Sequence, residues 1–390
     1  MNALEWRAVF SLGALYALRM VGMFMILPVL ALYAGTLPGG AQPWQVGIAL
    51  GIYAMTQAVL QIPLGIASDR IGRKPVIAAG MLVFALGSVL AALAHSIEGV
   101  MAGRALQGAG AISSAVAALL ADVTRPQVRT TAMAVLGAGM GLSFILALVL
   151  GPVIAGMVGV QGIFWLTALL ALLGIPVMIF GVPTPEIPSV QRGKLRDALA
   201  DGQLLRLDGG IFVLHATMIA LFTAAPQAIV ETLGLPGPKH WQVYLPVLVL
   251  SIVPVFPLIR WAEARGQMKH VFLSAIALLA CALALAAEGH ASAGGLLGAL
   301  LLFFIAFNFL EGALPSLISR RVAPESKGAA LGVYSTAQFL GGAAGGGLGG
   351  LALQHWGIGG VFAAAALLPL IWLTFTFGLA PIGAREATAR

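Results

Sequence analysis

The sequence predicts an all-α integral membrane protein in which twelve transmembrane helices form two parallel repeats of six. Three observations support this fold class: 60% of the 390 residues are apolar, only 9% are charged, and the second half of the chain repeats features of the first. Soluble domains carry about 25% charged residues, so the composition excludes a protein with an extensive water-exposed surface. The mean hydropathy of +0.99 is typical of a chain that lies mostly in lipid.

Apolar runs long enough to cross a bilayer, which takes about 20 residues each, mark the twelve helices. They are predicted at residues 8–34, 44–67, 76–95, 98–121, 130–156, 161–182, 208–232, 241–260, 271–288, 294–318, 329–353 and 359–380. The chain therefore divides into an N-terminal six-helix bundle (1–182), a cytoplasmic linker (183–207) and a C-terminal six-helix bundle (208–390). The lone cysteine, Cys281, lies in the apolar run LLACALAL and is expected to be a buried thiol.

The basic residues predict the orientation of the helices. Of the 21 lysines and arginines, Lys239 alone falls in an outer loop when the N-terminus is placed inside, and Arg19 and Arg104 lie within spans. All the others fall in inner loops or ends, so the positive-inside rule predicts that both termini are cytoplasmic. The net charge of +7 is therefore a topology signal that favours anionic lipid and gives no evidence for nucleic acid.

An internal repeat relates the two halves. A shift of 198 residues pairs Gly159 with Gly357, and the tripeptide WQV occurs at residues 44–46 and again at 241–243. Because each half holds an even number of spans, both halves run the same way through the membrane. Parallel repeats of this kind are typical of membrane transporters.

Residues 65–75, GIASDRIGRKP, resemble the G-x-x-x-D-R-x-G-R-K loop signature of the major facilitator superfamily. The segments LRMVGMFMILPVLALY (18–33) and FNFLEGALPSLIS (307–319) make the chain similar to the YajR-like bacterial transporters within that superfamily. The resemblance covers residues 7–380 and implies the major-facilitator fold. The type member of that subgroup has a small cytoplasmic domain after the last span, which has no counterpart in these 390 residues.

The loop signature also implies a cytoplasmic gate, in which Asp122 is the partner of Arg73. The expected gate residues are Gly65, Asp69, Arg70, Gly72, Arg73, Lys74 and Asp122. Gly72 permits a tight turn, and a carboxylate such as that of Asp69 is favoured near a helix N-terminus by about 0.3–1 kcal/mol. The alternative interpretation is that the basic residues of this loop serve only as topology charges.

The fifth span is similar to the antiporter signature of the superfamily. That signature places glycines at fixed spacing before a Gly-Pro pair, and this chain has Ala138, Ala147 and then Gly151-Pro152. Proline removes a backbone hydrogen bond, so we expect a bend at Gly151 and Pro152. A stripe of small residues that only packs against another helix would look the same.

Charged residues inside spans indicate where the chemistry takes place, because each costs about 2.5–3.5 kcal/mol at mid-helix on insertion scales. Glu311 is expected to be the single deep acid and the proton carrier, with a permanent structural ion pair as the alternative. The other candidates for proton coupling are Arg19, Arg104 and His215. Arg104 could instead tie helices together, and a lone histidine such as His215 is more often a packing residue.

Polar residues at four-residue spacing are expected to line the substrate pathway beside a pliable apolar wall. The predicted pathway residues are Met23, Phe24, Tyr53, Gln57, Gln61, Gln107, Phe222, Asn308, Tyr334 and Gln338. The stretch 345–350, GGGLGG, matches a dinucleotide-binding pattern, but it lies inside an apolar span and follows no strand. We interpret it as a helix-packing stripe.

These features predict a monomeric multi-pass transporter of the bacterial inner membrane that exports small amphipathic or apolar compounds by antiport with protons. No P-loop and no Cys/His cluster is present in the sequence, so we expect no enzyme activity, no metal and no cofactor, only a proton gradient. The expected partners are a small-molecule substrate and the lipid bilayer, without nucleic acid. The alternatives are a metabolite symporter or uniporter, and a membrane sensor that does not transport.

Overall fold

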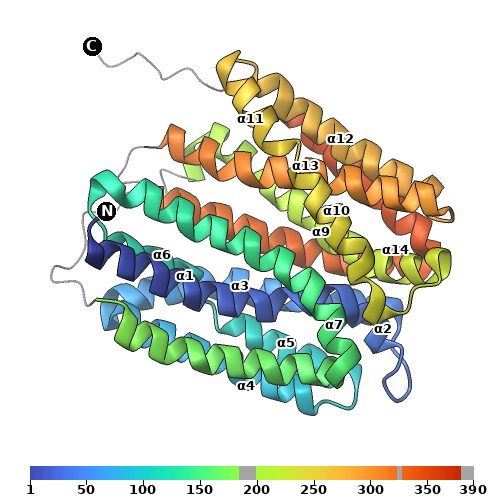
Figure 1. Cartoon of the computed structure of the whole chain (residues 1–390), viewed down its shortest axis with the longest axis horizontal. Helices are drawn as coiled ribbons and strands as arrows, with labels where there is room; N and C mark the ends of the chain where they lie inside the picture. Colours follow the sequence, from blue (N-terminus) through green and yellow to red (C-terminus); the bar gives the residue numbers. More distant parts are fainter. Residues whose placement is uncertain (184–198, 323–326, 379–390) are drawn as a thin grey trace. The chain divides into compact units, whose positions relative to one another are not determined.

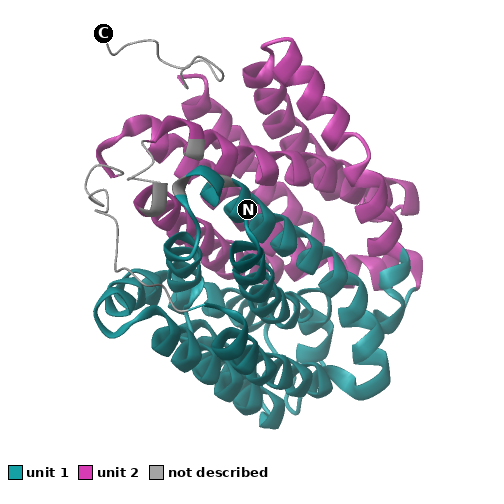
Figure 2. Cartoon of the chain, turned by 60° about the vertical axis from the view of Figure 1, so that its left-hand side comes forward, with its two compact units in different colours: residues 1–192, 235–242 teal, residues 193–234, 243–390 magenta. Residues whose placement is uncertain are grey.

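The computed structural model describes residues 1–183, 199–322 and 327–378, and these residues are helical with no strand among them (Figure 1). Most of the predicted linker, with its basic residues at 192, 194 and 196, lies outside the described residues. The described chain forms two compact units (Figure 2). Unit 1 comprises Met1–Arg192 with Leu235–Gln242, and unit 2 comprises Gly193–Gly234 with Val243–Arg390.

Unit 1 is built mainly from helices of the first half of the chain. They are α1 (Ala3–Phe24), α2 (Leu27–Ala34), α3 (Pro43–Ile71), α4 (Arg73–Leu93), α5 (Ile97–Ala109), α6 (Ser113–Asp122) and α7 (Pro126–Gly181), together with the short 3-10 helix η1 (Gly237–Lys239). Unit 2 contains α9 (Gly202–Leu233), most of α10 (Trp241–Ile252), α11 (Val255–Ala264), α12 (Met268–Gly289), α13 (Ala293–Arg321) and α14 (Lys327–Thr376). The α9 helix begins before residue 208, so residues 202–207 of the predicted linker are helical.

Ten helical stretches of the described chain are long and apolar enough to cross a membrane. Two of them, which contain α7 and α14, are broken by a glycine with positive φ: Gly159 at 71° and Gly357 at 67°. Counting the segments on either side of these breaks gives the twelve spans that the sequence predicts. The two glycines are the pair that the internal repeat matches, so the repeat is present in the backbone as well as in the sequence.

Small residues bring the helices into close contact. A Cβ atom added to Gly345 of α14 would lie 2.1 Å from the carbonyl oxygen of Ala216 in α9, and one added to Gly151 of α7 would lie 2.4 Å from that of Met25. Lipid gives helices no hydrophobic reason to associate, so such close approach is the main source of packing energy in a membrane. The glycine-rich stretch of α14 is therefore a packing stripe, as the sequence predicts.

One burial prediction is wrong. Cys281 is exposed on α12, although every neighbour in its run is apolar. In a membrane protein an apolar side chain can face lipid as readily as protein, so apolar neighbours do not establish burial.

Candidate functional site

A carboxylate, an amide and an imidazole from three helices of unit 2 lie together. Gln338 of α14 donates from Nε2 to Glu311 Oε1 of α13 at 3.3 Å, and the same nitrogen lies 2.8 Å from His215 Nε2 of α9. His215 Nδ1 is 3.9 Å from Glu311 Oε2. The Glu311 side chain is 36% exposed and that of His215 is 11% exposed. This Glu311–Gln338–His215 cluster therefore contains two titratable groups within reach of each other.

The bonding of Glu311 is incomplete. Its Oε2 atom is buried and has no hydrogen-bond partner among the described residues. Among the described residues no ion pair joins Glu311 to a lysine or an arginine, and the cation-forming group nearest its carboxylate oxygens in an ion pair is His215. A carboxylate with a purely structural role would instead be paired with a lysine or an arginine, with its oxygen atoms hydrogen-bonded.

The two intramembrane arginines, Arg19 and Arg104, lie in unit 1, where both are buried. Arg19 of α1 donates from Nη2 to Tyr53 Oη at 2.9 Å and to Gln57 Oε1 at 2.7 Å. Its Nε and Nη1 atoms have no hydrogen-bond partner in the described part of the chain. The ring of Phe84 covers the guanidinium, with 5.1 Å between Cζ and the ring centroid.

Arg104 of α5 also contacts the ring of Tyr53, whose centroid is 4.9 Å from the arginine Cζ. Its Nη1 donates to Gln107 Oε1 at 2.9 Å, and Gln107 Nε2 donates to Ser88 Oγ of α4 at 2.7 Å. Arg104 Nε also donates to the carbonyl oxygen of Ala49 in α3 at 3.4 Å, so these bonds connect α3, α4 and α5. The predicted pathway residues Tyr53, Gln57 and Gln107 thus surround the two arginines and are themselves buried.

The predicted gate residues meet at one end of unit 1. Arg73, at the start of α4, contacts Asp69 and Ser68 of α3, and its Nε lies 3.2 Å from Asp122 Oδ2 at the end of α6. The Arg73–Asp122 contact implied by the loop signature is therefore present. Gly72 joins α3 to α4 with φ of 102°, a conformation that favours glycine.

The other predicted gate residues have different surroundings. Lys74 Nζ donates to the carbonyl oxygen of Val182 at 2.6 Å, which ties α4 to the end of α7. A Cβ atom on Gly65 would lie 3.0 Å from Ser114 Oγ, so a small residue keeps α3 close to α6. Arg70 is exposed.

The family model described as Major Facilitator Superfamily matches residues 12–346. The chain belongs to the major facilitator superfamily. It is 46% identical over 376 residues to the inner membrane transport protein YajR of Escherichia coli (strain K12), a match that covers 95% of this chain and 82% of YajR. It is 27% identical over 346 residues to the multidrug resistance protein MdtH of Aeromonas hydrophila, covering 84% of this chain and 83% of MdtH.

A solved structure shows the same fold. The human organic anion transporter MFSD10 (TETRAN) matches with a TM-score of 0.71 over 96% of this chain and 100% of its own, at 20% sequence identity. The chain therefore has the major-facilitator fold and is a secondary transporter of this superfamily.

Three other predicted pathway residues of this major-facilitator transporter make contacts within their own unit: two pack against aromatic rings and one forms a hydrogen bond between helices. Phe222 is buried against Tyr244, with 6.0 Å between ring centroids, and Phe24 packs edge-on against Phe144 at 5.0 Å. Asn308 Nδ2 donates to Ser251 Oγ at 2.9 Å and so ties α13 to α10.

The last three predicted pathway residues are buried, and the predicted bend does not coincide with the observed break in α7. Met23, Gln61 and Tyr334 are buried, at 7%, 1% and 6% exposure. The break in the backbone of α7 lies at Gly159, seven residues after Pro152. The predicted bend at Gly151 and Pro152 stays a prediction.

Sequence reasoning missed a buried acid of α9, Asp208, and the expectation that Glu311 is the single deep acid of the spans stays a prediction. Asp208 is 6% exposed in α9, and its Oδ1 atom has no hydrogen-bond partner among the described residues. The sequence placed Asp208 at the very edge of a predicted span, whereas α9 begins six residues earlier, at Gly202. The N-cap pattern of Asp201 was the signal for that earlier start, because its side chain accepts from Gln203 and Leu204.

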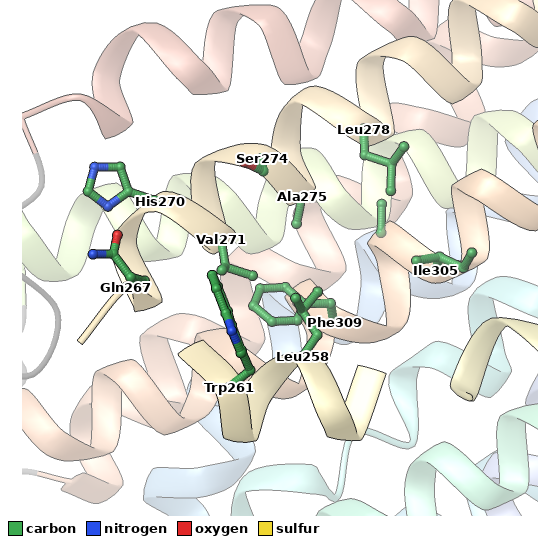
Figure 3. A pocket seen from close by; sticks show the side chains of 11 residues that line it. Leu258, Trp261, Gln267, His270, Val271, Ser274, Ala275, Leu278, Ile305 and Phe309 are labelled. Atoms are coloured by element: carbon green, nitrogen blue, oxygen red, sulfur yellow. The ribbon is translucent and has the colours of Figure 1, made fainter. Parts of the chain in front are cut away.

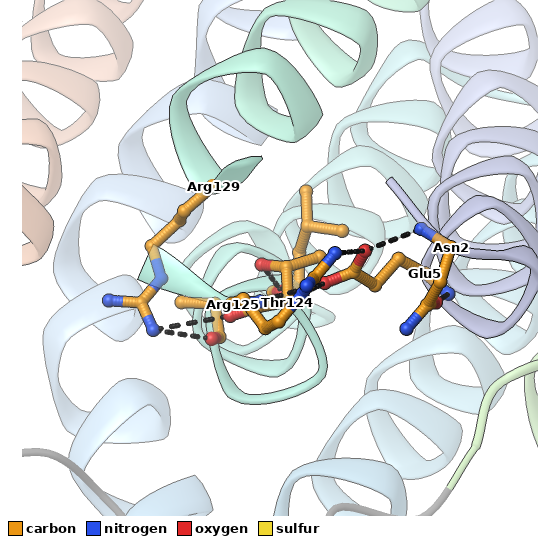
Figure 4. A network of polar contacts seen from close by, with 7 residues as sticks. Asn2, Glu5, Thr124, Arg125 and Arg129 are labelled. Atoms are coloured by element: carbon orange, nitrogen blue, oxygen red, sulfur yellow. Dashed lines mark hydrogen bonds and ion pairs between the residues drawn. The ribbon is translucent and has the colours of Figure 1, made fainter. Parts of the chain in front are cut away.

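Sequence reasoning also missed a polar network at the start of α1 (Figure 4). Glu5 completes a capping box with Asn2 and accepts from Arg125 Nε at 2.8 Å and Nη2 at 3.1 Å. The Glu5 carboxylate raises the pKa of Arg125. Arg129 Nη2 donates to the carbonyl oxygen of Ala121 at 2.9 Å. The network joins the first turn of α1 to the connection between α6 and α7, and the N-x-x-E spacing at residues 2–5 was its signal.

Proposed function

We propose that this transporter is a proton-driven antiporter that exports small amphipathic or apolar compounds across the inner membrane by alternating access, with Glu311 as the proton carrier. The observation that carries the proposal is the Glu311–Gln338–His215 cluster. There a carboxylate within a membrane-spanning helix contacts a neutral amide and an imidazole, and within the described chain it has no lysine or arginine partner. A carboxylate in a span is costly, so a transporter keeps one where it serves the transport cycle.

The geometry of the cluster suggests how the proton is handled. In the ionised state Glu311 Oε1 accepts from Gln338, while its Oε2 is left for a proton. His215 Nδ1 is 3.9 Å from Oε2, so a small movement brings the imidazole within hydrogen-bond distance of that atom. Protonation of Glu311 removes a charge from the membrane interior, and release of the proton restores it. Binding of substrate and proton in alternation would couple the two fluxes.

Three further observations support the proposed substrate class and location, the orientation of the termini and the antiport mechanism. The relatives named for multidrug resistance and for inner membrane transport support export of drug-like compounds and an inner-membrane location. The distribution of basic residues supports cytoplasmic termini. The spacing of Ala138, Ala147 and Gly151-Pro152, which is similar to the antiporter signature, supports antiport.

Transport in proteoliposomes tests the proposal through Glu311→Gln, which mimics the protonated acid. We expect the variant to lose substrate movement driven by an imposed pH gradient while substrate exchange between the two sides survives. Glu231→Gln is the matched control, because Glu231 is an exposed carboxylate of α9 that bonds only to Gln227 in the described structure.

A structural role for Glu311 predicts a different result. The variant would then have a lower melting temperature and would lose driven transport and exchange together. Full pH-driven transport by a well-folded Glu311→Gln variant would contradict the proposal, and so would a substrate flux of the wild type that does not depend on the pH gradient.

A further inference from the structure

A pocket with a volume of about 310 Å³ lies between α11, α12 and α13, apart from the Glu311–Gln338–His215 cluster (Figure 3). Each helix contributes one face: Leu258 and Trp261 from α11, Val271 and Ala275 from α12, and Ala306 and Phe309 from α13. The spacing of these residues, three or four positions along each helix, is that of a single helix face. Figure 3 shows the apolar side chains along the pocket and Gln267 and His270 together at one end.

The local sequence explains why the helices leave a space here. The α10 helix stops at Ile252, and α11 starts again at Val255 with Pro254 as its N-cap and runs for only 10 residues. The pocket walls on α12 and α13 include two alanines, Ala275 and Ala306, which do not fill the gap. The mouth is accessible, since Trp261 is 46% exposed and Ser274 is exposed.

The polar end of the pocket is basic. The guanidinium of Arg265 lies over the ring of Trp261 with 5.5 Å between Cζ and the ring centroid, and exposed His270 lines the pocket. Glu263 is the acid of α11, and it is already paired with Arg320 of α13 at 2.7 Å. The first turn of α12 has no side-chain cap, so its positive dipole end adds to the charge of Arg265 at this end.

We propose that this pocket binds an anionic phospholipid, with an acyl chain against Val271, Ala275 and Phe309 and the phosphate at Arg265 and His270. The charge pattern argues for this occupant: an apolar slot that ends in basic side chains and a half-exposed tryptophan matches a lipid tail, its anionic headgroup and the membrane interface. Basic pockets between transmembrane helices are known to bind the anionic headgroups of lipids. The site does not depend on the proposed antiport.

Lipid retention by the purified full chain tests the proposal. Dioleoyl phosphatidylglycerol and dioleoyl phosphatidylcholine would be titrated into detergent-solubilised protein and counted by native mass spectrometry. We expect preferential retention of one phosphatidylglycerol. One basic residue near an anionic surface contributes about five-fold in affinity, so Arg265→Gln should weaken retention by about that factor. Arg70→Gln, which removes an exposed arginine from unit 1, is the matched control for charge and should have no effect.

A second pair of variants tests the apolar slot. Ser274→Trp fills the pocket without a change of charge and should abolish the preferential retention, whereas Leu285→Trp, on an exposed position of the same helix away from the pocket, should preserve it. Equal retention of the two lipids by the wild type would overturn the proposal. Equal losses from Ser274→Trp and Leu285→Trp would also overturn it, and displacement of the lipid by inorganic phosphate would reveal a plain anion site instead. Arg265 is exposed, so its variant keeps the test valid if Ser274→Trp folds poorly.

Discussion

Arg73 connects three helices of unit 1 through a single side chain. It contacts Asp69 and Ser68 near the end of α3, belongs itself to α4, and meets Asp122 at the end of α6. Its side chain is only 8% exposed, and a planar guanidinium can serve several acceptors at once. The contacts hold the ends of these helices together, which is what the proposed cytoplasmic gate requires.

Removal of this side chain should loosen the proposed gate without unfolding the bundle. Hydrogen bonds to charged groups contribute about 1.5–3 kcal/mol, so Arg73→Ala should open the gate by about tenfold or more. The measurement is the rate at which a maleimide added from the cytoplasmic side labels a cysteine placed at Gln61, in a Cys281→Ala background.

Two controls accompany this measurement. Arg260→Ala removes an exposed charge of α11 in unit 2, outside the predicted gate, and should leave the labelling rate unchanged. Arg73→Lys keeps the charge but loses the fork geometry, so it should fall between the wild type and Arg73→Ala. Equal labelling of Arg73→Ala and Arg260→Ala would show that the basic residues of the loop serve as topology charges alone.

At the scale of elements, α9 and α14 pack through a row of glycines. Cβ atoms added to Gly341 and Gly345 of α14 would each lie 2.1 Å from a backbone carbonyl oxygen of α9, that of Phe212 and that of Ala216. Four-residue spacing keeps the row on one face of α14. The helices that carry His215 and Gln338 are thus held at backbone contact distance, which positions the two side chains toward Glu311.

Alanine at Gly345 should push α9 and α14 apart. The clash is with backbone, which cannot move aside as a side chain can, and overpacking typically costs about 1–3 kcal/mol. We expect Gly345→Ala to lower the melting temperature of the detergent-solubilised protein. Gly347→Ala on the same helix is the control: a Cβ atom there meets nothing within 4 Å, so stability should be unchanged or slightly higher. Equal effects of both substitutions would show that the glycine row does not set this contact.

At the scale of the whole molecule, the two halves are built on one plan. Gly159 in unit 1 and Gly357 in unit 2 break their long helices with nearly the same φ, 71° and 67°, at positions that the internal repeat pairs. Apart from adjacent parts of the same helix, no atom lies within 4 Å of a Cβ built on either glycine, so only backbone conformation demands glycine there.

Substitution at these two positions should therefore have equal and additive effects. Alanine in this region of φ and ψ costs about 1–3 kcal/mol, so Gly159→Ala and Gly357→Ala should each lower the free energy of unfolding by a similar amount. The sites lie in different units, and the double variant should equal the sum within about 0.5 kcal/mol. Unfolding in SDS titrations, followed by circular dichroism, checks this. A double variant no worse than either single one would contradict independent repeats.

Sequence patterns were most informative where the physics is local. The structure contains helices where the long apolar runs predict them, and it breaks two of them at the paired glycines of the repeat. It also contains the contact of Arg73 with Asp122 that the loop signature implies. Cys281 was misjudged because apolar side chains on a spanning helix face lipid and protein alike, so hydrophobicity carries no inside–outside signal. Asp208 was missed because a span boundary read from hydropathy lies a turn or more from the true helix start.

The sequence by itself determined that this protein spans a membrane, that it is built from two related halves and that it belongs to a transporter family, because these follow from composition, length and short motifs. Only the tertiary structure decided which polar residues meet inside the spans. Glu311, Gln338 and His215 come from three helices far apart in the chain, and Arg19 and Arg104 share Tyr53 rather than an acid. The physical reason is that contacts between helices depend on how each helix rotates about its axis, and close packing of small residues sets that rotation.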